Sequence, residues 1–431
     1  MSFTHAPDVH KTMCHLIQDR VAETPHIPAI AYKKENQWID VSFQEYANRI
    51  KQIGIGLLQL EMLPGARVIV LANTSIDWAI CDLGIVTAGG ITVPIYPTNT
   101  ESDALYIGEH SGASIAFVEN HLQCKKIYSL IESGQLKKII QFEGPIDNPD
   151  KVISLNEFRE IAQRAASATT TDLYQKRMES AKPDDLISIT YTSGTTGKPK
   201  GVMIHHRMMW QTLSDTYELI HDSVDTSDSL LTFLPLSHVM GKFESMTPWF
   251  FGWKCNYAQS VDKLLSNIEE VRPTLMVAVP RIFEKVYAKI SDQIENGPEL
   301  KKTLFKRAVE IGKTYYSYKD KDQFVPPHIS IAYQLAYKLV LSKVYEKFGG
   351  RMKFFISGGA PLPAELASFL RTAKLIVLEG YGLTETCAPC ATNTLHSCII
   401  GTVGKPFPSC ELKIASDGEI LVKGPDRKSV V

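Results

Sequence analysis

The sequence predicts an α/β protein in which helices cover largely parallel β-sheets. Short runs of β-branched residues alternate with longer amphipathic stretches along most of the chain, which is the pattern of βαβ units. The composition is that of a soluble globular protein, since 44% of the 431 residues are hydrophobic and 22% are charged. A chain of this length buries a large core without disulfide staples, and we expect two or three structural units.

The first part of the chain, about 1–180, is expected to form one sheet subdomain. Apolar residues at helical spacing predict helices over 42–60 and 76–88, and β-branched runs predict strands over 67–71, 91–95 and 114–118. The apolar stretch 78–97 contains Asp82, Gly89, Gly90 and Pro94, so it indicates a helix followed by a strand rather than a membrane span. Residues 147–185 are rich in Asp, Thr, Ser and Ala, and we expect a surface connection there.

The second region, about 181–398, is expected to form a second sheet subdomain. We predict strands over 186–190, 229–233, 275–279 and 352–356, and a helix that begins near residue 205. Residues 282–348 have a helical pattern with an interruption at 324–327. After residue 401, short segments punctuated by Gly and Pro predict a small antiparallel unit.

Charge and cysteine content exclude several classes of protein. The chain has 46 Lys and Arg against 47 Asp and Glu, so it lacks the dominant positive field of nucleic-acid-binding proteins, and we expect no nucleic acid partner. Residues 1–20 lack the apolar core of a signal peptide, and eight scattered cysteines suit the reducing cytoplasm, where we expect the protein to be. Cys387 and Cys390 have the spacing of a redox or zinc motif, but the second pair, Cys398 and Cys410, is spaced too widely for a zinc ribbon, and we expect all four to be packing residues.

The most informative stretch is Tyr-Thr-Ser-Gly-Thr-Thr-Gly-Lys-Pro-Lys-Gly at 191–201. Glycines let the backbone approach a ligand, successive N–H groups form a concavity that binds anions, and hydroxyls and lysines add donors and positive charge. These properties favour phosphate binding over a plain surface turn. The loop is not a Walker A motif, because Gly-Lys is followed by Pro, which argues against a P-loop ATPase; a kinase His-Arg-Asp set is also missing.

Residues 191–206 resemble the signature phosphate loop of the adenylate-forming enzymes, a superfamily of acyl- and aryl-CoA synthetases, luciferases and peptide-synthetase adenylation domains. Blocks at 234–239, 357–363, 379–386, 401–406 and 418–424 resemble further family blocks in the same order, so the resemblance covers about 10–425. It implies the large N-terminal domain of that fold over 1–425: two helix-flanked, mostly parallel sheets, and a small distorted β-barrel to which 399–425 contribute. Residues 279–285, a helical insertion over 290–347 and residues 348–352 look like long-chain fatty acyl-CoA synthetases; the alternative for the insertion is a solvated hairpin without a substrate role.

The resemblance implies ATP-dependent activation of a long-chain fatty acid to acyl-AMP and then to acyl-CoA, with release of pyrophosphate and AMP. ATP, Mg²⁺ and the co-substrate CoA are the implied ligands. The implied catalytic residues are His238, which orients the carboxylate, Thr384, which contacts the α-phosphate, and Glu385, which coordinates Mg²⁺. The implied nucleotide-binding residues are Thr192, Ser193, Gly194, Thr195, Thr196, Gly197, Lys200, Gly358, Gly359, Ala360, Glu379, Gly380, Tyr381, Gly382 and Thr384. Aromatic residues within 241–252 are candidates for the wall of an acyl tunnel, and the family's gating tryptophan falls near Lys242 and Phe243.

The end of the chain departs from the family pattern. Members of this kind continue with a Thr-Gly-Asp motif, a hinge and a small C-terminal domain that carries a catalytic lysine, whereas residues 426–431 do not resemble that continuation. We therefore expect the small domain to be absent here. Two alternatives stay open: a truncated acyl- and nucleotide-binding remnant with little or no activity, and an adenylate-forming enzyme for another carboxylic acid. Long-chain acids partition into bilayers, so peripheral membrane contact is a further expectation.

Overall fold

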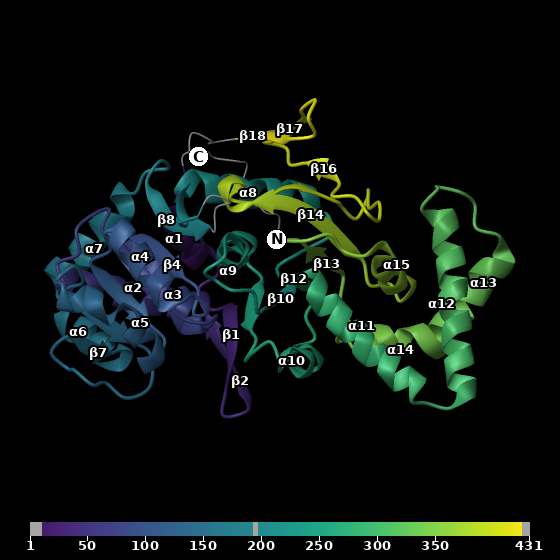
Figure 1. Ribbon diagram of the computed structural model, residues 1–431, viewed down its shortest axis with the longest axis horizontal. Coiled ribbons are helices and arrows are strands. Elements are labelled where there is room, and N and C mark those ends of the chain that lie inside the picture. The colour runs from purple at the N-terminus through teal and green to yellow at the C-terminus, as the bar shows by residue number, and fades with distance from the viewer. Residues whose placement is uncertain (1–10, 193–196, 425–431) are drawn as a thin grey trace.

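The computed structural model describes residues 11–192 and 197–424. The first of its two large sheets lies on one side of the molecule (Figure 1). Seven strands form this sheet in the order β7-β6-β5-β3-β4-β8-β9, with every pair parallel except β8 and β9. The strands are β3 (Arg67–Leu71), β4 (Ile91–Ile95), β5 (Ile115–Val118), β6 (Lys138–Gln141), β7 (Val152–Ser154), β8 (Leu186–Thr192) and β9 (Lys200–His205). The strands predicted at 67–71, 91–95 and 114–118 are confirmed.

Helices cover both faces of the first sheet, because alternate residues of its strands point to opposite sides. Val68 and Val70 of β3 join the large core cluster, whereas Ile69 and Leu71 join a separate cluster. The large cluster includes residues of α2 (Phe43–Gln59), α3 (Ile76–Thr87), α6 (Leu155–Ala165) and α7 (Ala168–Ser180), and the separate cluster includes residues of α4 (Glu101–Ser111) and α5 (His121–Glu132). Helices predicted at 42–60 and 76–88 are thereby confirmed.

The expected surface connection over 147–185 is wrong. Apart from short loops, this stretch forms β7, α6 and α7, and the two helices pack on α2. A Cβ added at Gly54 would lie 2.4 Å from the Tyr174 ring, and one added at Gly56 would lie 2.5 Å from the Phe158 ring. The polar composition reflects the solvent-facing sides of two amphipathic helices, whose few buried aromatic residues are enough to fix them.

The second sheet has nine strands in the order β16-β15-β14-β13-β12-β10-β11-β1-β2. They are β1 (Pro28–Lys34), β2 (Gln37–Ser42), β10 (Ser229–Thr232), β11 (Lys254–Tyr257), β12 (Leu275–Ala278), β13 (Phe354–Ser357), β14 (Val377–Leu383), β15 (Ala388–Thr392) and β16 (Lys405–Pro406). The helices that accompany it are α1 (Met13–Glu23), α8 (His206–Ile220), α9 (Val239–Phe251), α10 (Leu264–Val271) and α15 (Ala364–Thr372). The start of α8 confirms the helix predicted near residue 205.

Two strand pairs, β8 with β9 and β1 with β2, do not belong to the sheet that their place in the sequence predicts. The strand predicted at 186–190 was expected to open the second sheet, but β8 pairs with β4 and so belongs to the first sheet. Conversely, β1 pairs with β11, which brings an N-terminal hairpin to the edge of the second sheet. Strand partners are chosen by long-range packing, which local composition does not encode.

The helical insertion is confirmed and projects from the second sheet, away from the first (Figure 1). It consists of α11 (Pro280–Glu295), α12 (Glu299–Lys319), α13 (Pro327–Ala336), the π-helical η1 (Tyr337–Leu341) and α14 (Ser342–Glu346). The predicted interruption at 324–327 separates α12 from α13. None of the helices in the described residues combines the length and apolar character that a membrane span requires.

The last described segment confirms the antiparallel unit predicted after residue 401. Strands β17 (Glu411–Ile414) and β18 (Ile420–Lys423) form a two-stranded hairpin, and β16 joins the edge of the second sheet. Because this hairpin is a separate two-stranded sheet within 197–424, the distorted β-barrel stays a prediction. The divergent tail at 426–431 lies outside the described residues.

Candidate functional site

A cavity of about 690 Å³ opens where the carboxyl ends of β12 and β13 meet the start of α9 and the turn after β14. The carboxyl edge of a parallel sheet is the usual place for a ligand in α/β proteins. Its lining residues are Tyr96, Thr192, Lys200, Leu234, Pro235, His238, Val239, Met240, Val277, Ala278, Val279, Ile356, Ser357, Gly358, Gly359, Gly380, Tyr381, Gly382, Leu383, Thr384, Glu385, Ala388 and Pro389. Ten of the residues predicted from the sequence are in this set.

The two ends of the phosphate loop both reach the cavity. Thr192 ends β8 and Lys200 begins β9, and the two residues pair directly across the antiparallel ladder, so the loop is the connection of a hairpin. Gly197 has φ of +116° and is exposed without lining the cavity. The other four loop residues predicted to bind phosphate lie outside the described residues: Ser193, Gly194, Thr195 and Thr196.

The segment after β13 supplies a small-residue wall. Gly358 and Gly359 line the cavity, and Gly359 has φ of +83°, a conformation that favours glycine. The hydroxyl of Ser357 at the end of β13 is buried and has no hydrogen-bond partner among the described residues. Ala360, which the resemblance placed against the adenine, is exposed and lies outside the lining.

The end of β14 and the turn after it bring five of the predicted residues to the cavity: Gly380, Tyr381 and Gly382 from the strand, and Thr384 and Glu385 from the turn. Glu379 is the exception. Its side chain is buried, and its carboxylate accepts hydrogen bonds from the backbone N–H groups of Leu362 (3.0 Å) and Gly401 (3.3 Å). We therefore replace its expected role as a nucleotide ligand with a structural one: it ties together the two loops that flank β14.

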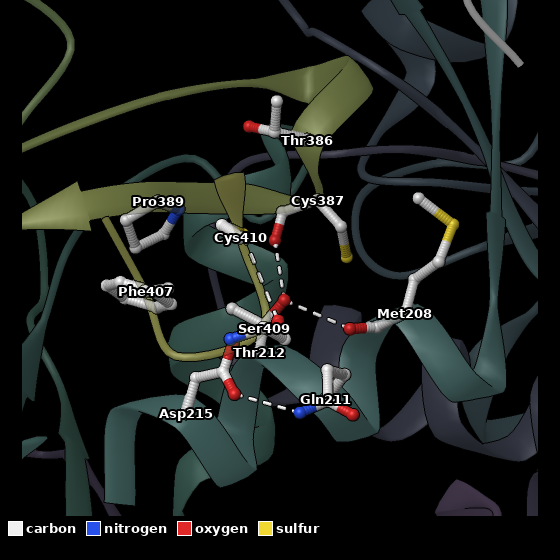
Figure 2. A pocket seen from close by; sticks show the side chains of 10 residues that line it. All are labelled: Met208, Gln211, Thr212, Asp215, Thr386, Cys387, Pro389, Phe407, Ser409 and Cys410. Atoms are coloured by element: carbon white, nitrogen blue, oxygen red, sulfur yellow. Dashed lines mark hydrogen bonds between the residues drawn. The ribbon is translucent and has the colours of Figure 1, made fainter. Parts of the chain in front are cut away.

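The turn that carries Glu385 is strained and is contacted by helix α8. After η2 (Thr384–Thr386), Cys387 and Ala388 have φ of +53° and +77°, which is rare for residues other than glycine and costs about 1–3 kcal/mol each. The Thr212 hydroxyl of α8 lies 3.1 Å from the Cys387 carbonyl oxygen and 3.0 Å from the Met208 carbonyl oxygen, and it shares its one hydrogen between these two acceptors, as Figure 2 shows. A Cβ at Gly382 would lie 2.2 Å from the Ala388 carbonyl oxygen, so only glycine permits this approach.

A small pocket lies between this turn and α8 (Figure 2). Here the buried carboxylate of Asp215 accepts hydrogen bonds from the Gln211 amide (2.8 Å) and from the Ser409 hydroxyl. Helix α8 therefore holds both the Glu385 turn and the segment that leads to β17. Cys387 lines this pocket and is buried, as is Cys390, and the expected packing role of both is confirmed.

His238 caps the N-terminus of α9 at the cavity. Its Nδ1 accepts the backbone N–H of Met240 (3.1 Å), so the neutral ring carries its proton on Nε2. Desolvation by the surrounding protein lowers the pKa of His238, although the ring is open to the cavity, and the ring is neutral at pH 7. His238 therefore offers one N–H donor without a positive charge.

The rest of the lining is apolar, and the sequence analysis missed most of it. Leu234, Val239, Met240, Val277 and Ile356 form this wall. The available signal was position, because Val277 and Ile356 lie near the carboxyl ends of predicted parallel strands. Tyr96 was missed in the same way: it directly follows β4, and burial raises its pKa to about 12.

The aromatic residues of α9 do not wall this cavity. Phe243, Trp249, Phe250 and Phe251 are almost fully buried in the core and are not among the lining residues. Trp249 stacks on Tyr46 of α2 with ring centroids 4.9 Å apart. The expected tunnel wall is therefore not supported at these positions.

The cavity residues fit a nucleotide with a divalent cation. Lys200, Thr192 and Thr384 supply positive charge and hydroxyl donors, Ser357 supplies an unpaired hydroxyl, and Glu385 supplies a carboxylate. No group of three or more His, Cys, Asp or Glu side chains suited to a metal occurs in residues 11–192 and 197–424. A single carboxylate suits Mg²⁺, which usually takes one or two protein carboxylates and completes its shell with phosphate oxygens and water.

Comparison with known proteins identifies the family of this chain. The family described as AMP-binding enzyme matches residues 17–427. The long-chain-fatty-acid–CoA ligase FadD15 of Mycobacterium bovis is 30% identical over 417 residues, which cover 96% of this chain and 67% of that protein. The human long-chain-fatty-acid–CoA ligase ACSBG2 is also 30% identical over 417 residues, covering 94% of this chain and 61% of that protein. The chain thus spans about two thirds of the length of these relatives.

Solved structures show the same fold. The inhibitor-bound N-terminal domain of FACL13 from Mycobacterium tuberculosis has a TM-score of 0.65 at 20% identity, covering 96% of this chain and 89% of that chain. O-succinylbenzoate coenzyme A synthetase (MenE) from Bacillus subtilis, in complex with ATP and magnesium ion, has a TM-score of 0.67 at 19% identity. The match covers 96% of this chain and 71% of that chain. Together with the family match, these likenesses identify the α/β architecture as the large domain of the adenylate-forming fold. The chain belongs to the AMP-binding enzyme family and is a ligase of the adenylate-forming type.

Proposed function

We propose that the protein uses ATP to activate a long-chain fatty acid, first to acyl-AMP with release of pyrophosphate and then to acyl-CoA with release of AMP. The observation that carries the proposal is the composition of one cavity. Its polar residues include Lys200, Thr384 and Glu385, its other walls are largely apolar, and neutral His238 lines the same space.

The first step requires no general base. A fatty carboxylate has a pKa near that of Glu, about 4.3, and is ionised at pH 7. One carboxylate oxygen forms a bond to the α-phosphorus while the bond from that phosphorus to the pyrophosphate oxygen breaks, and no proton is transferred. The obstacle is the approach of an anion to a polyanion, so charge neutralisation and positioning supply the catalysis.

The chain's own residues fit this task. Lys200 and Thr192, at the ends of the phosphate loop, would bind phosphate oxygens, and Thr384 would donate to the α-phosphate. Glu385 would hold Mg²⁺, which neutralises phosphate charge when bound. The Nε2–H of His238 would donate to the acid's carboxylate and orient it, and the wall that contains Leu234, Val277 and Ile356 would accept the start of the acyl chain.

The choice of a long-chain acid rests on the relatives named long-chain-fatty-acid–CoA ligases and on the apolar wall. Another carboxylic acid is the second candidate, because the same fold occurs in O-succinylbenzoate coenzyme A synthetase. We also propose a cytoplasmic protein with small-molecule partners. The eight cysteines are scattered along the sequence without the spacing of a disulfide framework, which supports a reducing compartment.

Exchange of labelled pyrophosphate into ATP tests the first step. We expect exchange that depends on palmitate and Mg²⁺ and is much weaker with benzoate or O-succinylbenzoate. Exchange with an aromatic acid alone would reassign the substrate, and nucleotide binding without any exchange would show a binding protein without turnover. Formation of palmitoyl-CoA, measured separately, tests the thioester step.

A further inference from the structure

The helical insertion carries an apolar helix face that no other part of the described chain covers. Phe324, in the loop before α13, is 82% exposed, and Ile331, Leu335 and Leu339 are 60%, 56% and 66% exposed. The last three repeat every four residues, so they lie on one side of the helix formed by α13 and η1. We call these four residues the insertion face.

The opposite side of the same helix is firmly packed. Tyr333, Ala336 and Leu341 are buried, and the Tyr333 hydroxyl donates to the Thr372 carbonyl of α15 (3.0 Å). Figure 1 shows α12 and α13 at the end of the molecule, beyond α15 and far from the first sheet. The insertion face is therefore held on an ordered support that projects from the protein.

The charge around the insertion face is strongly positive. Residues 299–347 contain ten Lys and Arg against five Asp and Glu, whereas the rest of the chain contains 36 against 42. Lys338 and Lys343 are exposed three and four residues after Leu335 and Leu339, which places them beside the apolar residues. Within residues 11–192 and 197–424, neither lysine has a carboxylate partner within 4 Å.

From this combination we infer that the insertion face docks onto the surface of a bilayer that contains anionic phospholipids. The four apolar side chains enter the headgroup region, and the flanking lysines bind lipid phosphates, as in other interfacial helices. A second copy of the chain suits the face less well, because a two-fold contact would bring the same positive charges together. Only the biological purpose of docking rests on the proposed function: a long-chain acid resides in bilayers, so docking brings the enzyme to its substrate.

Cosedimentation with lipid vesicles tests the inference on the whole protein. We expect binding to vesicles of phosphatidylcholine with about 30% phosphatidylglycerol at low salt, and binding weaker by roughly tenfold or more to pure phosphatidylcholine or at high salt. Equal binding to both vesicle types, or no binding to either, would overturn the inference.

Two independent variants locate the surface. Replacing Ile331, Leu335 and Leu339 by Asn removes the apolar contact, and Lys338→Glu with Lys343→Glu reverses the charge while leaving the apolar residues in place. Each should weaken vesicle binding by about tenfold or more. The matched control is Leu63→Asn with Leu122→Asn, two leucines that are 70% and 69% exposed on other elements, and it should bind as the wild type does.

The outcomes separate this inference from the proposed function. If both insertion variants bind vesicles as the wild type does, or if the wild type is a dimer that the triple Asn variant dissociates without any vesicle binding, docking through this face is wrong. Pyrophosphate exchange with detergent-dispersed palmitate does not require docking. Intact exchange without vesicle binding would overturn the docking surface and leave the proposed function standing. Vesicle binding that depends on the insertion face, without any exchange, would support the docking surface and contradict the proposed function.

Discussion

Lys242 and Asp82 form an ion pair in the interior: Nζ lies 2.5 Å from Oδ1 and 2.7 Å from Oδ2, and both side chains are 1% exposed. Thr92 of β4 donates to the same carboxylate (2.6 Å). Lys242 lies on α9, one turn after His238, and Asp82 lies on α3, which covers the first sheet. The pair therefore joins the helix that positions His238 to the other sheet of the molecule.

Asp82→Asn is expected to destabilise the protein by about 3–5 kcal/mol, because it leaves the Lys242 ammonium buried without a counter-charge. The free energy of unfolding in urea is the measurement. Asp82→Leu combined with Lys242→Met is the matched control, and it should lose much less stability since no charge is stranded. A loss in the double variant as large as in the single one would contradict this account.

Thr212→Val is expected to weaken binding of Mg·ATP by about fivefold, because it removes the hydrogen bond to Cys387 that supports the strained Glu385 turn. Calorimetry with ATP, with and without Mg²⁺, measures the effect. Only the Mg²⁺-dependent part of the affinity should fall, whereas a general loosening would lower both. Thr212→Ser keeps the hydroxyl and should restore the affinity.

Lys200→Ala and Glu385→Ala are each expected to weaken Mg·ATP binding by about tenfold or more, because they remove from the cavity a cation and the carboxylate proposed to hold Mg²⁺. Lys198→Ala is the control: Lys198 lies two residues earlier, outside the lining, with its ammonium over the Tyr106 ring. Unchanged affinity in both cavity variants would remove the roles assigned to Lys200 and Glu385.

His238→Ala is expected to lower kcat/KM for the fatty acid by about 10- to 100-fold while ATP affinity is unchanged, since we propose that the lost N–H donor binds the acid rather than the nucleotide. Steady-state kinetics with each substrate varied in turn separates the two effects. Because the pKa of His238 is lowered, the ring is already neutral at pH 7, and its titration should not change the rate between pH 7 and 8. A fall over that range that disappears in the variant would show that the protonated ring is the active form.

His206 should make stability depend on pH. It is 2% exposed, its Nδ1 accepts the Met13 N–H (3.0 Å), and burial lowers its pKa to about 3. As the pH falls from about 6.5, the unfolded chain binds a proton that the folded chain excludes, so this residue lowers the free energy of unfolding by up to about 1.4 kcal/mol per pH unit. Unfolding in urea at pH 7, 6 and 5 should show a smaller decrease for His206→Gln; an equal decrease would assign the effect to other groups.

The site was predictable from the sequence wherever consecutive residues carry the chemistry. Lys200 belongs to a loop whose composition itself indicates phosphate binding, whereas Gly358, Tyr381 and Glu385 belong to blocks whose adenine or metal contacts are implied by the resemblance; the structure brings all four residues to one cavity. Glu379 shows the limit of this reasoning. It lies in the same block, but its carboxylate is used by two backbone N–H groups from loops distant in the sequence.

By itself, the sequence determined the α/β class, helices α2, α3 and α8, the helical insertion, and strands β3, β4, β5, β8, β10, β12 and β13, because periodicity and local composition act over a few residues. The blocks at the cavity were recognised by their resemblance to those of the adenylate-forming enzymes. Only the tertiary structure decided that β8 belongs to the first sheet and β1 to the second, that α6 and α7 pack on α2, and that the α9 aromatics are core. It also decided that Lys242 and Asp82 meet inside the protein. These outcomes depend on which surfaces, distant in the sequence, pack together and exclude water. The free energy gained by that burial depends on both segments of each pair, so neither segment predicts it alone.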